Sequence, residues 1–141
     1  MSHNSNKNQS NNIKNMRENI SSGSPWEEII GYSRAVKIGN VIEISGTTAS
    51  SDSGIVGKND LYVQTKFILE KIKGVLKEAG AEMQHVVRTR MFLTDIAQWE
   101  EAARAHGEFF KDIKPVTTMV EVNKLIDNDM LIEIEFSAII N

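Results

Sequence analysis

Charged and apolar residues alternate along two segments that read as β-strands. Arg88 and Arg90 fall on one side of the first segment, and Glu133 and Glu135 fall on one side of the second, because successive strand residues point to opposite faces. A glutamate among apolar neighbours and beside another carboxylate is expected to have a raised pKa, which suits a general base acting on water. Glu133 is therefore a candidate catalytic residue, and Arg90 is a candidate anchor for a small anion. A cross-strand salt-bridge ladder is the alternative interpretation.

Two other side chains are candidates for contact with a polar ligand. Thr117 shares one side of its predicted strand with Met119 and Glu121. If this side coincides with the side that carries Arg90, arginines and carboxylates gather on one face of a sheet. His106 lies on a predicted helix, and histidine is the side chain that titrates unperturbed near neutral pH. A position on the helix surface or in an interface is the alternative for His106.

Turn signals and hydrophobic spacing predict the elements that must position these residues. Gly39 and Asn40 form a two-residue hairpin signal, which pairs Ile38 with Val41 and places Arg34 diagonal to Glu43. The full order is strand, strand, helix, strand, helix, strand, strand, over residues 32–38, 41–46, 61–79, 84–93, 95–110, 117–122 and 130–140. Two helices cover only one face of one sheet. This predicts an α+β domain whose other face is solvated or covered by a partner.

Composition limits the possible domain extent, partners, cofactors and location of the protein. Residues 1–24 are rich in Asn and Ser and are expected to be a disordered tail, with one domain over 25–141. The net charge of -3 argues against a nucleic-acid partner. The chain has no cysteine, no apolar run long enough for a membrane span and no local metal-binding motif. We expect a cytoplasmic protein with no metal, no organic cofactor and no membrane partner.

Four segments carry a resemblance to a known family. They are YSRAVKIGNVIEISGTTA from residue 32, LKEAGA ending at residue 81, VVRTRMFLTDIAQWE from residue 86, and KPVTTMVEVNKLI with MLIEIE from residue 114. In this order and spacing they resemble the Rid family, also called YjgF, from about residue 30 to the end of the chain. The last segment is the most specific of the four.

The resemblance implies a chorismate-mutase-like fold: a mixed sheet with two helices on one face, assembled as a homotrimer. It implies that small 2-keto or imino acids bind in clefts between subunits and that imines and enamines are hydrolysed there without a cofactor. Glu133 matches the glutamate that activates water. Tyr32 and the backbone near Gly46 match other parts of the binding site.

The chain departs from the deaminase branch of that family at one position. There an arginine holds the substrate carboxylate, but Thr117 follows Pro115-Val116 here, and threonine supplies no positive charge. Arg90 is a possible replacement. We expect cofactor-free hydrolysis of small imines, enamines or related carbonyl compounds with altered specificity. The alternatives are a non-catalytic ligand-binding or scaffolding trimer and, less favoured, a ribonuclease.

Overall fold

The computed structural model describes residues 16–141 of the chain. The helices and strands are, in chain order, β1 (Glu18–Ile20), α2 (Pro25–Ile30), β2 (Ala35–Ile38), β3 (Val41–Thr47), β4 (Ser50–Ser51), β5 (Gly54–Ile55), α3 (Leu61–Glu78), β6 (Val86–Leu93), α4 (Trp99–Phe110), β7 (Val116–Glu121) and β8 (Ile132–Ile139). Two short 3-10 helices, η1 (Met83–His85) and η2 (Ile96–Gln98), precede β6 and α4.

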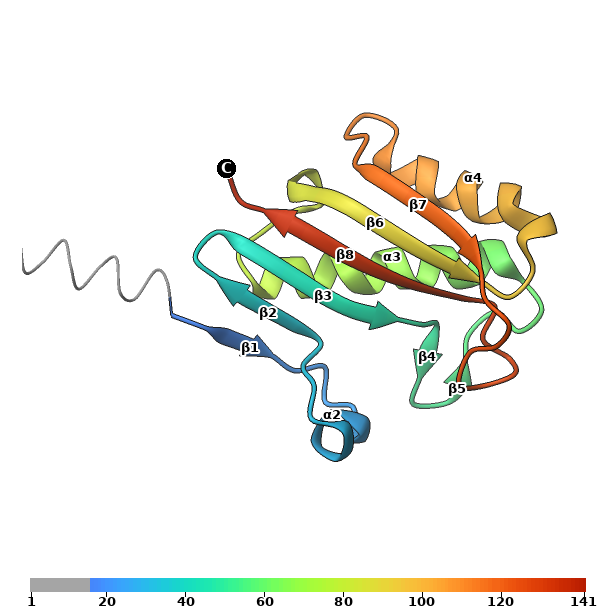
Figure 1. The fold of residues 1–141 in the computed structure, drawn as a ribbon, viewed down its shortest axis with the longest axis horizontal. Coiled ribbons are helices and arrows are strands. Elements are labelled where there is room, and N and C mark those ends of the chain that lie inside the picture. The colour runs from blue at the N-terminus through green and yellow to red at the C-terminus, as the bar shows by residue number, and fades with distance from the viewer. Residues whose placement is uncertain (1–15) are drawn as a thin grey trace, which may run out of the picture.

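Six strands form one mixed sheet in the order β1-β2-β3-β8-β6-β7 (Figure 1). Only β6 and β7 are parallel, and the chain between them passes through α4, as a parallel connection requires. The two long helices, α3 and α4, lie on the same face of the sheet (Figure 1). This arrangement confirms the predicted fold class.

The core lies between that face and the two helices. Alternation along β3 and β8 turns Ile42, Ile44, Ile134 and Phe136 toward the helices, where all four are buried. The residues of α3 that pack on this sheet face recur at helical spacing. They include Ile68, Leu69, Ile72 and Leu76, each 0% exposed.

The hairpin between β2 and β3 forms as its turn residues predict. Gly39 has φ 61°, and Ile38 pairs with Val41 while Val36 pairs with Glu43. Arg34 lies one residue before β2, and its side chain is buried. Its guanidinium group runs to the far end of β3 rather than toward Glu43. This contact matters for the site described below.

Several elements differ from the sequence prediction, among them the helix α2, which lies ahead of the first predicted element. Glu18–Ile20 form the edge strand β1 beside β2, so the predicted disordered tail is wrong for these residues, whereas residues 1–15 lie outside the described part. An edge strand is stabilised by backbone hydrogen bonds, which need no apolar side chains. The loop predicted after β3 contains the hairpin β4–β5. The second helix starts at Trp99, because Asp95 caps η2 instead.

The sheet face opposite the helices carries a mixture of charged and apolar side chains. Exposed apolar residues on this face include Ile38, Val41, Val116 and Val120, each at least 41% exposed. No element of residues 16–141 covers this face (Figure 1). Within the same residues, no helix is both long enough and apolar enough to cross a membrane.

Candidate functional site

Glu133 points to the open face of the sheet. Its neighbours in β8, Ile132 and Ile134, are both 0% exposed on the helix side, so alternation turns Glu133 the other way. It is half-buried there and pairs across the sheet with Phe92 of β6. A carboxylate in this position is partly withdrawn from water although it lies on a surface.

A β-bulge brings Gly46 against the Glu133 carboxyl group. Ile44 pairs with Phe136 and Thr47 pairs with Ile134, so two residues of β3 oppose the single residue Glu135 between them. A Cβ atom placed on Gly46 would lie 2.9 Å from both Cδ and Oε2 of Glu133. Only glycine allows the carboxyl group to approach the β3 backbone this closely.

Arg34 contacts the same part of β3. Its Nη1 donates to the Gly46 carbonyl oxygen at 2.7 Å and to Thr47 Oγ1 at 3.0 Å. Its Nη2 donates to the Tyr32 hydroxyl at 3.3 Å. Its Nε has no hydrogen-bond partner among the described residues, and the side chain is only 6% exposed. A buried guanidinium group therefore ties Tyr32 to the strand that supports Glu133.

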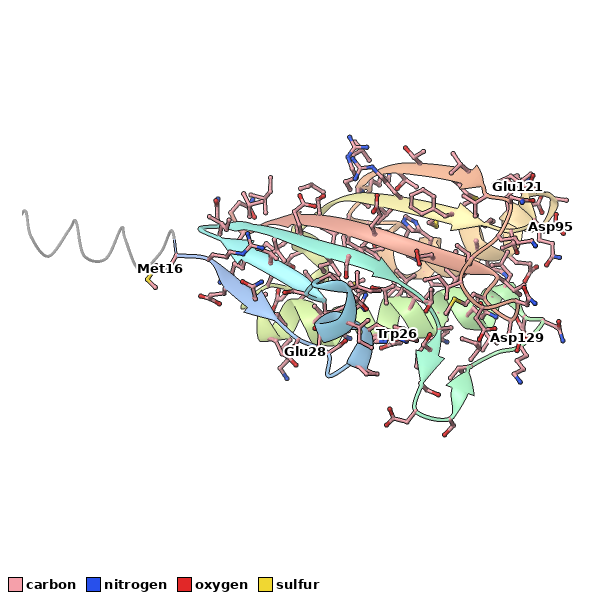
Figure 2. The ribbon with its side chains drawn as sticks, turned by 60° about the horizontal axis from the view of Figure 1, so that its bottom comes forward. Met16, Trp26, Glu28, Asp95, Glu121 and Asp129 are labelled. Atoms are coloured by element: carbon pink, nitrogen blue, oxygen red, sulfur yellow. The ribbon has the colours of Figure 1, made fainter. Side chains whose placement is uncertain are left out.

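The short helix α2 fixes the position of Tyr32. Ser24 caps its first turn in a capping box with Glu27. Gly31, at φ 86°, ends the helix, and the backbone N–H groups of Gly31 and Tyr32 both donate to the Glu27 carbonyl oxygen. Figure 2 shows Trp26 on the outside of this helix, where it is 58% exposed.

The ionisation of Glu133 follows from this environment. Burial raises the pKa of the Glu133 carboxyl group, the positive charge of Arg34 opposes that rise, and the negative charge of Glu135 adds to it. The net pKa is raised, as its apolar neighbours predict. On α3, burial and the charge of Arg34 together lower the pKa of Lys71.

Gly46→Ala is expected to lower the free energy of unfolding by less than about 1 kcal/mol, because the added methyl group displaces the flexible end of the Glu133 side chain and not the backbone. Thermal or urea unfolding measures this change. Gly74→Ala is the matched control: on α3, a Cβ on Gly74 meets nothing within 4 Å, and alanine favours a helix by about 0.5–1 kcal/mol over glycine. Equal effects of the two substitutions would contradict the close approach at Gly46.

Thr117 and His106 lie on the other face of the sheet. The parallel register pairs Thr117 with Thr89 and pairs Arg90 with Thr118, so Thr117 faces α4 and Arg90 faces away from it. Alternation within each strand left open whether the polar side of Thr117 coincides with the side that carries Arg90, because it does not fix the relative register of two strands. In the structure the two sides do not coincide.

Arg90 lies on the open face with Glu133. It pairs across the strands with Glu135, and the nearest N–O distance is 3.5 Å between half-exposed side chains. Glu133 is the next outward-facing residue of β8. The role of Arg90 as an anion anchor stays a prediction, and the ion pair with Glu135 is the alternative already identified.

A separate group of carboxylates lies at the end of the sheet away from α2, where Figure 2 shows Asp95, Glu121 and Asp129. The side chain of Asp95 accepts a hydrogen bond from the Ala97 backbone. Glu121 accepts one from the Ile96 backbone, and Asp129 pairs with Lys58 at 3.7 Å. These contacts give the three carboxylates roles in local structure. Within residues 16–141, no group of three or more His, Cys, Asp or Glu side chains is placed to hold a metal ion.

The structure thus brings Tyr32, Gly46 and Glu133 together and leaves Thr117 and His106 on the opposite face of the same chain. Sequence reasoning missed Arg34, although its position between Tyr32 and the hairpin was visible. A half-buried carboxylate with a raised pKa is suited to accept a proton. With its open mixed sheet, the domain belongs to the class of small α+β proteins with the YjgF fold.

Comparison with known proteins agrees with this class. The family model described as endoribonuclease L-PSP matches residues 24–140. The chain belongs to this family, whose members are also named YjgF, Rid and RutC proteins. A crystal structure of a Mycobacterium tuberculosis member is 44% identical, with a TM-score of 0.81, and the match covers 89% of this chain and 100% of that one.

Two curated relatives are also similar. A RutC family protein of Pyrococcus abyssi is 37% identical over 108 residues, 76% of this chain and 84% of that protein. The 3-aminoacrylate deaminase RutC of Acinetobacter baylyi is 32% identical over 104 residues, 73% of this chain and 82% of that protein.

Proposed function

We propose that the protein is a cytoplasmic homotrimer that hydrolyses small imines, enamines or related carbonyl compounds without a metal or organic cofactor. The observation that carries this proposal is the half-buried Glu133, with its raised pKa and its carboxyl group against Gly46. A carboxylate that is poorly solvated and still open to one side is suited to take a proton from water.

The reaction balances with one water molecule. An enamine first takes a proton on carbon from solvent and gives up an N–H proton to solvent, which makes it an imine. Glu133 then removes a proton from water as the water oxygen bonds to the imine carbon, and solvent supplies a proton to the nitrogen, which gives a carbinolamine. Protonated Glu133 passes its proton to this nitrogen, and ammonia leaves as the hydroxyl group gives its proton back to solvent. The carbonyl product forms and Glu133 returns to its ionised form. The Tyr32 hydroxyl, held by Arg34, is the proposed donor of a hydrogen bond to the substrate.

Two features favour an assembly in which subunits complete one another's sites. The open sheet face carries apolar residues that a partner would bury. Glu133 and Thr117 lie on opposite faces of one chain, and Thr117 lies on β7, at the edge of the sheet. If both contact one ligand, they must come from two copies of the chain.

The Acinetobacter baylyi relative, a 3-aminoacrylate deaminase by name, supports an enamine as the substrate class. The substrate of this chain is proposed to differ, because Thr117 has no charge with which to hold a carboxylate. Losing a hydrogen bond to a charged group typically costs about 1.5–3 kcal/mol.

The natural protein is expected to elute as a species of three times the 15.8 kDa chain mass and to accelerate hydrolysis of small neutral imines. Multi-angle light scattering measures the mass. An assay that generates the imine enzymatically and detects carbonyl compound and ammonia measures the rate. Activity toward 2-aminoacrylate should be weak or absent. A stable monomer, or no acceleration with any small imine, would refute the proposal.

The second candidate is a non-catalytic trimer that binds small carbonyl compounds. The uncharged Thr117 favours it, because the chain lacks the residue that holds the substrate in the deaminase branch. The same assay separates the two candidates: this one requires saturable ligand binding with no turnover.

A further inference from the structure

Three side chains form a hydrogen-bonded chain from the sheet edge to the space beneath α4. Thr117 Oγ1 lies 2.9 Å from Thr89 Oγ1, and Thr89 Oγ1 lies 2.9 Å from His106 Nε2. Thr89 is 0% exposed, His106 is half-buried, and Thr117 is exposed. The parallel register of β6 and β7 creates the chain, because it sets Thr89 beside Thr117 on the side facing α4.

A purely structural role explains only part of this arrangement. A buried hydroxyl group needs a hydrogen-bond partner, and His106 alone would satisfy Thr89. Thr89 instead links the imidazole to a hydroxyl group at the surface, at the start of the edge strand. The second contact of Thr117, with the Pro115 carbonyl oxygen, is longer, at 3.3 Å. The chain therefore ends in a hydroxyl group that is held in place and open to a ligand.

The three hydrogen-bonded side chains, Thr117, Thr89 and His106, carry no net charge while the imidazole is neutral. Burial lowers the pKa of the His106 imidazole, and the Phe110 ring packs beside it with centroids 4.6 Å apart. The three side chains offer a bound carboxylate no positive charge, so a carboxylate that lost its hydration in a closed cleft at Thr117 would do so without compensation, which is costly. An uncharged polar group loses much less hydration.

The direction of the hydrogen bonds can reverse. With the proton on His106 Nε2, each group donates outward, and the Thr117 hydroxyl, which then donates to the Pro115 carbonyl oxygen at 3.3 Å, can turn its proton to a ligand carbonyl oxygen instead. With the proton on Nδ1, each hydroxyl group donates inward and Thr117 accepts from an N–H group. A neutral amide presents both kinds of partner, whereas a carboxylate presents only acceptors.

We propose that Thr117, oriented by Thr89 and His106, recognises an uncharged amide or carbonyl group, so that the substrate is a neutral carbonyl or imine compound and not an imino acid. This inference rests on the proposed function and specifies its substrate class. Thr117 is the residue that contacts the ligand, and Thr89 and His106 are positioning residues.

The test compares pyruvate with pyruvamide, which share the 2-keto group and differ only in replacement of the carboxylate by an amide. Isothermal titration calorimetry of the trimer at pH 7 is expected to show that pyruvamide binds about tenfold more tightly than pyruvate. This factor corresponds to about the net free energy of one hydrogen bond. Thr117→Val should remove this preference. Thr118→Val, one residue along on the opposite sheet face, should leave it unchanged.

Two further variants separate recognition from folding. His106→Phe breaks the chain without changing its charge, and it should reduce pyruvamide binding while the melting temperature reports any loss of stability. Lys114→Gln removes the nearest basic side chain along the sequence and should leave the preference intact.

The contrary outcomes are distinct. Tighter binding of pyruvate, or a preference that survives Thr117→Val, overturns the inference and leaves the proposed function standing. If pyruvate is preferred and Arg90→Ala abolishes that preference, Arg90 is the anion anchor and Thr117 is not the specificity residue. Binding of neither compound overturns the inference, whereas the proposed function is decided separately by the imine-hydrolysis assay described above.

Discussion

Glu133→Gln is expected to reduce imine hydrolysis by about 10²–10⁴-fold, the usual contribution of a positioned general base. The amide matches the carboxyl group in size and fits against Gly46, so the site should keep its shape. Steady-state kinetics with the natural protein and the variant measure the loss. A variant that keeps most of its activity would exclude Glu133 as the base.

The pH dependence of imine hydrolysis by the natural protein should reflect the ionisation of the same carboxyl group. Only the ionised form of Glu133 accepts a proton, so kcat/KM should rise with pH through the pKa of this group and then level off. Because burial raises that pKa above its usual value of 4.5, the rise should lie above pH 4.5. Glu135→Gln is the control, since it removes a charge that raises the pKa and should move the rise to lower pH.

The stability of the folded protein should fall with increasing pH over the range in which kcat/KM rises. A carboxyl group with a raised pKa in the folded state favours folding when it is protonated, and this contribution is lost as pH increases through the folded-state pKa. At pH 7 the ionised Glu133 therefore opposes folding. Glu133→Gln should leave the melting temperature at pH 7 unchanged or raise it. A large fall would mean that Glu133 is mainly structural.

Arg34→Met is expected to lower the free energy of unfolding by about 2 kcal/mol or more, because it leaves the Gly46 carbonyl and the Thr47 hydroxyl without their donor in a buried place. Methionine keeps much of the side-chain volume, so the effect reports lost hydrogen bonds more than a cavity. Thermal unfolding should show a fall of about 5–10 °C.

The same substitution should also alter the chemistry. The charge of Arg34 lowers the pKa of Glu133, so its removal should move the rise in kcat/KM to higher pH. Arg34→Lys keeps the charge and should keep most of the pH profile. Arg104→Met is the control for stability: Arg104 lies in an exposed pair with Glu101, and such pairs contribute about 0–1 kcal/mol. If Arg34→Met changes neither stability nor the pH profile, the positioning role is wrong.

The sequence by itself determined the elements whose signals are local. Gly39 and Asn40 specify the turn between β2 and β3, and the turn fixes their register from Ile38 and Val41 onward. Helical spacing of apolar residues defines α3, and alternation in β8 assigns Glu133 to the side opposite Ile132 and Ile134. The motifs from Tyr32 to Glu135 also sufficed to indicate the family, which the comparisons confirm.

The tertiary structure alone decided how these strands meet. The bulge in β3 adds one residue against β8 and so turns Gly46 toward Glu133. The parallel register of β6 and β7 turns Thr117 toward His106 and away from Arg90. A shift of one residue in pairing moves a side chain to the other face of a sheet. Pairing depends on residues far apart in the chain, so patterns within each strand could not reveal it. The burial of Arg34 follows from the same cause, since its partners Gly46 and Thr47 come within reach only when the sheet has formed.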